Sequence, residues 1–139
     1  MVPRALIHAL DADVQLKRVR RLKSSKAHAF PVYKGDLDHI LGWISKARVL
    51  ELLNEPGEDS PLAGNLMPVG SIFEEATAAD LADSFLKVAC PFVVVKNHQG
   101  GTVGIVPLTE FVELLFGLEI DTPSLPMVNE SPVSRAYEL

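Results

Sequence analysis

The sequence predicts an α/β (α+β) fold in which two β-α-β-β-α units pack as a pseudo-twofold pair. The main observation is an internal repeat, because residues 30–53 recur at 92–115 with a constant offset and no gap. The matched pairs include Phe30/Phe92, Val32/Val94, Lys34/Lys96, Gly42/Gly104 and Leu53/Leu115. A repeat of this length marks one supersecondary unit used twice. A unit of about 60 residues forms only a marginal core alone, so we expect the two to pack together.

The first unit opens with an apolar run and a basic amphipathic segment. Residues 5–10 are largely apolar and predict a strand. Asp13 is the expected N-cap of a helix that ends near Lys26, because apolar residues recur every three positions between them. The lysines and arginines of this segment predict a solvated helix face or, alternatively, contact with an acidic partner or polyphosphate.

A hairpin and a second helix complete the first unit. Residues 30–33 and 40–44 have strand composition, and the turn residues Gly35 and Asp36 lie in a loop of several residues between them. From residue 45 to about residue 54 the pattern is helical, with Ala47, Leu50 and Leu53 on one face and Val49 and Leu52 flanking it.

The second unit repeats this order of elements. Residues 71–73 predict a strand, and Thr77 with Asp80 three positions later predicts a capping box at the start of a helix. Residues 91–96 and 102–106 predict the hairpin strands. The last helix is predicted from apolar residues at helical spacing, namely Leu108, Phe111, Val112 and Leu115.

Local composition indicates where the units begin and end. Pro, Gly and acidic residues gather between Pro56 and Pro61, which is typical of a linker. After Gly117 the chain shows no period. We therefore expect a first unit at 1–55, a linker at 56–66, a second unit at 67–118 and an extended or disordered tail at 119–139.

Overall composition excludes several classes of protein. With 139 residues, of which 47% are hydrophobic and 22% charged, the chain has the composition of a soluble globular domain. The net charge of -5 gives no reason to expect nucleic acid as a partner. The single cysteine, Cys90, favours a cytosolic compartment and is expected to be a small core residue. No stretch is long and apolar enough to predict a membrane span.

No catalytic or metal-binding pattern is visible in the sequence. The four histidines lack the spacing of metal ligands, and no Ser/His/Asp or Cys/His arrangement is suggested. We therefore expect no catalytic residue, no metal site and no enzymatic activity.

Three stretches of the chain together resemble a known family. They are Pro3-Arg4, the segment from Phe30 to Gly42, and the segment from Gly100 to Val106. In this order on a tandem repeat, they are similar to a pair of cystathionine-β-synthase (CBS) domains, also called a Bateman module. Within that superfamily they resemble the CBS pair of CorC/hemolysin-C-like magnesium and cobalt transporters, which are related to the cyclin M proteins.

This resemblance implies a regulatory role, a location and two partners. In that family a transmembrane domain precedes the CBS pair, so the resemblance implies a covalently linked membrane transporter domain. CBS pairs commonly associate into flat dimers, which implies a homodimer. The expected location is cytoplasmic, as the cytosolic portion of an inner-membrane protein.

The resemblance also implies candidate binding residues. CBS pairs commonly bind adenine nucleotides at a motif of Gly, two apolar residues, Ser or Thr, two variable residues and Asp. The hydroxyl and the helix N-terminus bind phosphate, while the carboxylate accepts from ribose. The first copy places Ser45 and Arg48 at the hydroxyl and carboxylate positions, and the second places Pro107 and Glu110 there. Ile7 is expected in the cleft with Glu110.

Because both copies depart from the motif, two interpretations remain open. If the clefts bind a ligand, we expect AMP or ATP, with Mg²⁺, near these five residues. If they are degenerate, the chain is a ligand-free dimerisation scaffold. In that case Ser45 only caps its helix, and Glu110 only favours a helix N-terminal turn.

Overall fold

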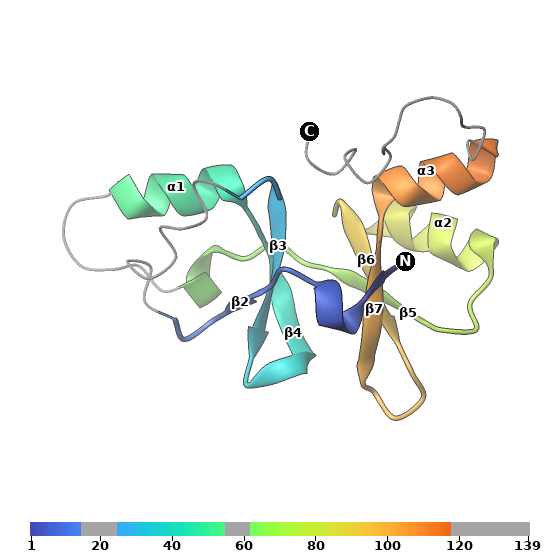
Figure 1. Cartoon of the computed structure of the whole chain (residues 1–139), viewed down its shortest axis with the longest axis horizontal. Coiled ribbons are helices and arrows are strands. Elements are labelled where there is room, and N and C mark those ends of the chain that lie inside the picture. Colours follow the sequence, from blue (N-terminus) through green and yellow to red (C-terminus); the bar gives the residue numbers. More distant parts are fainter. Residues whose placement is uncertain (15–24, 55–61, 118–139) are drawn as a thin grey trace.

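Two β-sheets lie side by side in the middle of the molecule, with helices toward the outside (Figure 1). The structure is a computed structural model, and it describes residues 1–14, 25–54 and 62–117. The predicted helix between Asp13 and Lys26 falls largely outside these residues, as do most of the predicted linker and the whole predicted tail. The predicted α/β (α+β) class and the paired packing are confirmed.

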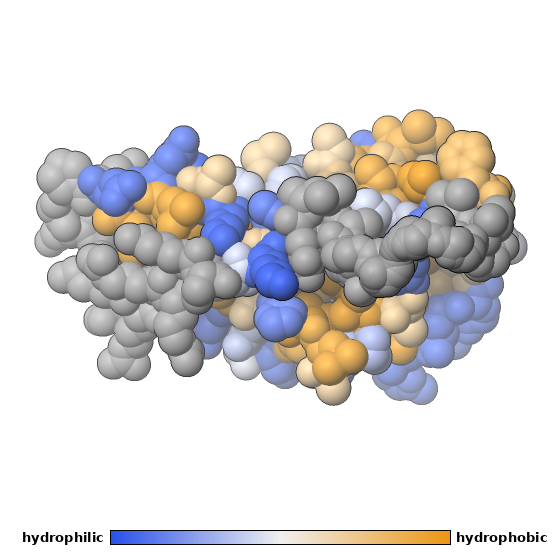
Figure 2. Space-filling model, turned by 45° about the horizontal axis from the view of Figure 1, so that its top comes forward, coloured by the Kyte–Doolittle hydropathy of each residue, from blue (hydrophilic) through white to orange (hydrophobic). Residues whose placement is uncertain are grey.

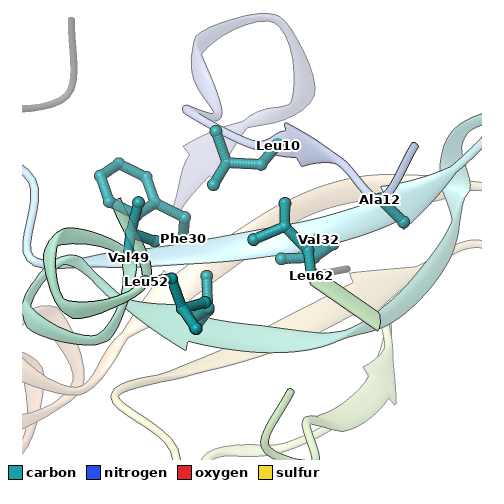
Figure 3. Packing of buried hydrophobic residues seen from close by; sticks show 8 residues of the cluster. Leu10, Ala12, Phe30, Val32, Val49, Leu52 and Leu62 are labelled. Atoms are coloured by element: carbon teal, nitrogen blue, oxygen red, sulfur yellow. The ribbon is translucent and has the colours of Figure 1, made fainter. Parts of the chain in front are cut away.

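The first sheet has three strands in the order β2-β3-β4, with β2 parallel and β4 antiparallel to β3. The strands are β2 (Leu10–Asp11), β3 (Ala29–Lys34) and β4 (Asp36–Ser45). α1 (Lys46–Asn54) follows β4 directly and buries Val49 and Leu52. Figure 3 shows these two side chains close to Phe30 of β3, in the core of the first unit.

The second sheet has four strands in the order β1-β7-β6-β5. They are β1 (Val2–Pro3), β7 (Thr102–Pro107), β6 (Phe92–Lys96) and β5 (Gly70–Phe73). Two helices, α2 (Ala78–Lys87) and α3 (Leu108–Phe116), pack on this sheet. Their buried residues Leu81 and Phe111 meet Val93 of β6 in the core of the second unit.

A third apolar cluster joins the two units. Its buried members are Cys90, Phe92 and Val94, and partly buried residues from the first hairpin, including Ile40 and Trp43, pack against them. Burial raises the pKa of the Cys90 thiol to about 11, so this thiol stays protonated and behaves as an apolar core group, as predicted.

Each sheet forms backbone hydrogen bonds with a segment that precedes the other unit in the chain. Val2 of β1 pairs with Ile105, and Met67 forms a two-way bridge with Trp43 through N–O distances of 2.9 and 2.8 Å. The two sheet residues are equivalent in the repeat. The segment at 1–3, predicted to belong to the first unit, therefore lies on the sheet of the second. Two short 3₁₀ helices, η1 (Arg4–Leu6) and η3 (Leu62–Asn65), adjoin these crossing segments.

The segments around Val2 and Met67, here called the crossing segments, explain why the repeat keeps a glycine directly before Ile105 and before Trp43. A Cβ atom on Gly42 would lie 2.6 Å from the Met67 carbonyl oxygen, and one on Gly104 would lie 2.4 Å from that of Val2. Both separations are far below van der Waals contact, so only glycine lets the crossing backbone approach.

The two hairpins pair their strands in different registers, so residues that match in the sequence repeat do not all have equivalent positions in the structure. Val32 pairs with Gly42, ten positions later, whereas Val95 pairs with Gly104, nine positions later. The first strands of the two hairpins are therefore displaced by one residue relative to the sequence match. Since side chains alternate between faces, the displacement places Phe30 under α1 but Phe92 between the sheets.

Three other predictions are corrected. Residues 5–10 do not form one strand, because η1 takes the beginning of the run and β2 begins only at Leu10. The loop of the first hairpin is short, since Lys34 already pairs with Asp36 across Gly35, whose φ is 85°. In α1 the buried residues are Val49 and Leu52, while Ala47 is exposed. In α3, whose existence the spacing of Leu108, Phe111, Val112 and Leu115 correctly predicted, only Phe111 is buried.

The predicted capping box at the start of α2 is confirmed. The Asp80 amide donates to Thr77 Oγ1 at 3.1 Å, and the Thr77 amide donates to Asp80 Oδ2 at 3.0 Å. The amide hydrogen bond from Thr77 holds the pKa of the Asp80 carboxyl below its ordinary value. Two otherwise unsatisfied amides at the helix N-terminus are thus satisfied.

Candidate functional site

A cavity of about 330 Å³ lies where the two units meet. Three parts of the chain line it: the N-terminal segment with Val2 and Ile7, the start of β3 with Ala29 and Pro31, and the second unit around Phe92 and Pro107. The cavity depends on the strand exchange, because β1 carries Val2 across to the second sheet. Its described lining is mainly apolar, with His8, His28 and Thr109 as the polar side chains.

Two of the five predicted site residues, Ile7 and Pro107, line this cavity. Glu110 lies beside it in the first turn of α3, where its carboxylate accepts a hydrogen bond from the Met1 amino group. A carboxylate in this place is stabilised by the positive end of the helix dipole. The structure thus brings Ile7 and Pro107 to one cavity, whereas Glu110 follows the lining residue Thr109 in the chain and is not itself among the described lining residues.

The start of α3 is already partly occupied by protein groups. Pro107 is its N-cap residue and provides no side-chain hydrogen bond. The Leu108 amide donates to the Pro91 carbonyl at 2.8 Å. The first free amide of the helix is therefore used inside the protein and does not face a ligand.

Thr109 is a lining residue that sequence reasoning missed. Its side chain lines the cavity, yet its Oγ1 atom is buried and has no hydrogen-bond partner among the described residues. An unsatisfied buried hydroxyl is costly and usually has a ligand, a water or a rearrangement to satisfy it. The only sequence signal was its variable position between Pro107 and Glu110.

The other two predicted site residues, Ser45 and Arg48, lie at the start of α1 and bond within the protein. Ser45 Oγ accepts the Arg48 amide at 3.0 Å, which is a helix cap. The Arg48 guanidinium donates to Glu51 Oε1 at 3.0 Å and to Asn65 Oδ1 at 2.7 Å. The side chain that replaces the expected carboxylate thus ties α1 to η3.

A polar cluster next to the hairpin ends connects three chain segments. Asp38 Oδ1 on β4 accepts the Thr102 amide at 2.8 Å and also a hydrogen bond from Arg4 Nη1. Lys96 Nζ donates to the Asp38 carbonyl at 3.1 Å. The Thr102 hydrogen bond, followed by Arg4, lowers the pKa of the Asp38 carboxyl below its ordinary value. This cluster joins the first hairpin to the second and to the N-terminal segment.

Within the described parts of the chain, no group of three or more His, Cys, Asp or Glu side chains is placed to hold a metal ion. None of the helices in residues 1–14, 25–54 and 62–117 is long and apolar enough to cross a membrane.

No protein-family model matches the chain. Its sequence is similar to those of several bacterial UPF0053 proteins. YhdP of Bacillus subtilis is 28% identical over 120 residues, which are 84% of this chain and 27% of that protein. The inner membrane protein YoaE of Escherichia coli K12 is 29% identical over 129 residues, 92% of this chain and 25% of that protein. The chain thus spans about a quarter of the length of these relatives.

Solved structures with the same fold are CBS domains. The CBS domain of a bacterial CNNM/CorC family Mg²⁺ transporter has a TM-score of 0.73 at 25% identity, over 84% of this chain and 72% of that one. The structure of such a CBS domain in complex with ATP has a TM-score of 0.74 at 24% identity, with 84% of each chain covered. A CBS-domain pair from Klebsiella pneumoniae with bound AMP gives 0.71 at 21% identity, over 84% and 94%.

The fold and its central cavity define a tandem CBS-domain pair. The resemblance inferred from the sequence is confirmed, since the similar structures include CBS domains of the CNNM/CorC transporter family and the similar sequences are UPF0053 proteins.

Proposed function

We propose that the chain is the regulatory CBS pair of a CorC-like divalent-cation (Mg/Co) transporter, and that it responds to an adenine ligand bound in the cavity between its units. The observation that carries this proposal is the location of the cavity, whose walls come from both units. The described lining suits a flat, weakly polar ring system such as adenine, because small-molecule sites are mostly apolar with few polar groups. The ATP and AMP complexes of similar CBS structures support the same ligand class.

A ligand in this cavity would act on the arrangement of the two units. It would contact Ile7 and Pro31 on one side and Phe92 and Pro107 on the other. A ligand shifts a conformational equilibrium only by its difference in affinity for the two states. A ligand that touches both units meets that condition, because a change in their packing changes its contacts.

The regulated partner in this proposal is a membrane transporter domain in the same polypeptide, with the module on the cytoplasmic side. Support comes from the relatives, which are more than three times as long as this chain and include an inner membrane protein. A homodimer is the further partner that the resemblance implies. The role is regulatory and not catalytic.

The second candidate function is a ligand-free dimerisation scaffold. One observation favours it: at the start of α1, Ser45 and Arg48 are used in internal hydrogen bonds. Such bonds replace a ligand with protein groups in that half of the molecule.

Thermal melting of the purified chain with adenosine, AMP, ADP and ATP, each with and without Mg²⁺, tests the proposal. A ligand present at 100 times its Kd stabilises the fold by about 2.7 kcal/mol. Ala29→Leu, which places a larger side chain in the cavity, should abolish the shift. The matched control Ala47→Leu lies on the exposed face of α1 and should keep it. If no adenine ligand shifts the melting temperature at millimolar concentration, the scaffold function replaces the regulatory one.

A further inference from the structure

We infer that the cavity selects an uncharged adenine ligand, the nucleoside, over its phosphorylated forms. This inference rests on the proposed function, namely that the cavity binds an adenine ligand at all. It concerns the part of the ligand beyond the base, where the residues of this chain do not fit a phosphate group.

The size of the cavity is the first argument. Small-molecule sites range from roughly 300 to 1,000 Å³, and this cavity of about 330 Å³ is at the lower end of that range. Its described lining contains no lysine or arginine. A phosphate transferred from water into an apolar site without a compensating partner is strongly disfavoured. The cavity therefore suits a base and sugar better than a polyphosphate.

The start of α3 is the second argument, because a helix N-terminus is the usual place for a phosphate. Here Pro107 has no hydroxyl to donate, and the Leu108 amide is bonded to Pro91. The Glu110 carboxylate lies in the first turn of the helix, near its positive end, and is paired with the Met1 amino group. A phosphate at this position would meet a like charge nearby and would find fewer donors than the helix would otherwise provide.

Thr109 is the third argument, because it carries a neutral hydroxyl group at a residue that lines the cavity. Its Oγ1 is buried at the cavity wall without a hydrogen-bond partner in the described part of the chain. Because Thr109 is a lining residue, a change of its side-chain rotamer that exposed this hydroxyl to the cavity would offer a neutral partner to a ribose hydroxyl or a ring nitrogen. Neutral donors and acceptors of this kind compensate a neutral ligand, whereas an isolated phosphate requires charged partners.

The test is isothermal titration calorimetry of the intact chain with adenosine, AMP and ATP. We expect adenosine to bind at least as tightly as AMP, and ATP to bind most weakly. Glu110→Gln should raise AMP affinity relative to adenosine affinity about tenfold, because it removes the like charge that only the phosphate meets, while a lost ribose contact would weaken both ligands equally. The matched control Glu113→Gln, one turn further along α3, should leave both affinities unchanged.

A second variant keeps the inference testable if Glu110→Gln loses stability. Pro107→Thr restores a hydroxyl at the helix start and should also favour AMP relative to adenosine. AMP or ATP binding ten times more tightly than adenosine to the unmodified chain would overturn the selectivity while leaving the proposed function intact. The absence of binding by all three ligands would instead overturn the proposed function.

Discussion

The two hairpins of the molecule have equivalent positions in the two units, but they differ in register by one residue. The second strands, β4 and β7, match as the sequence repeat predicts, with Gly42 and Gly104 each lying under a crossing segment. The first strands do not, because Phe30 faces α1 whereas Phe92 faces the junction of the units. A sequence match between paired apolar residues thus marks a shared type of element, and only strand pairing shows which face each residue takes.

The two helix starts that follow these hairpins also differ. At α1 the Ser45 hydroxyl and the Arg48 guanidinium are bonded inside the protein. At α3 the equivalent residues are Pro107, which lines the cavity, and Glu110, which lies in the first turn of the helix. The polar positions of the repeat have diverged, whereas the glycines that allow backbone contact have not. The polar side chains at the start of α1 are therefore bonded within the protein, whereas the start of α3 adjoins the described cavity.

The largest expected effect comes from truncating the two phenylalanines. Phe30→Ala should destabilise the fold by up to about 5 kcal/mol, because it opens a void in a closed core. Phe92→Ala should cost less, about 3 kcal/mol, since Phe92 already borders a cavity. Urea unfolding would measure both values. Equal losses in the two variants would contradict the register difference.

The next effect comes from adding a methyl group to the paired glycines. Gly42→Ala and Gly104→Ala should each destabilise the fold by about 1–3 kcal/mol, because the new Cβ meets a backbone carbonyl. Gly104→Ala should also weaken ligand binding, because it displaces Val2 from the cavity wall. Gly64→Ala is the control, since a Cβ atom on Gly64 would meet no other atom within 4 Å and stability should hardly change.

A smaller effect is expected at the α1 cap. Ser45→Ala should destabilise the fold by about 1 kcal/mol through loss of the hydrogen bond to the Arg48 amide. Calorimetric titration should show unchanged adenine-ligand affinity, because Ser45 does not line the described cavity. Loss of binding in this variant would place the ligand in the first half of the pair and contradict the division between the two helix starts.

The smallest effect concerns the Asp38 cluster between the hairpins. The pKa of Asp38 is lowered in the folded protein, so its carboxylate stabilises the fold above its ordinary pKa of 3.8. That stabilisation is lost as the pH falls through the lower folded value. Asp38→Asn should therefore be less stable than the unmodified chain at pH 7, and the difference should shrink below about pH 4.

Unfolding by urea between pH 7 and pH 3 measures this dependence on Asp38. Asp13→Asn serves as a control, because its carboxylate forms an exposed pair with Lys34 at 3.6 Å, and such pairs contribute little. A difference for Asp38→Asn that stayed constant over the whole pH range would show that its carboxylate is not what couples the hairpins.

Much of the fold could be predicted because its signals are local. Thr77 and Asp80 predicted a capping box from their spacing, and the hairpin strands around Gly35 and Gly100 followed from composition and turn residues. The buried face of α1 could not be predicted, because Val49 and Leu52 are selected by contact with β3 and η3 and not by the helical period alone.

Some residues of the candidate site could likewise be predicted from the sequence, and others could not. Ile7 and Glu110 were assigned to one cleft from the family resemblance; the structure places Ile7 and Pro107 on the described cavity, with Glu110 in the adjoining first turn of α3. Thr109 was missed, since nothing local distinguishes a variable position that lines a cavity from one that faces solvent. The internal bond from Arg48 to Asn65 was also invisible, because it joins residues on different elements.

Apolar side chains on α3 show the same limit on a larger scale. The helical spacing of Leu108, Phe111, Val112 and Leu115 predicted the helix, yet Leu115 is 58% exposed, and Leu114 and Phe116 are 66% and 69% exposed. Figure 2 shows a group of hydrophobic side chains at the surface in this part of the molecule. The period identifies a helix, but the other elements decide which of its faces they cover.

The sequence by itself determined the class of fold, the two-unit plan and the motif positions, because these follow from periodicity, turn chemistry and repetition along the chain. Only the tertiary structure decided that Val2 pairs with Ile105, that the first strands differ in register, and that one helix start borders a cavity. The physical reason is that strand partners are chosen by long-range backbone hydrogen bonding and by burial of one face, which residues distant in the chain determine together.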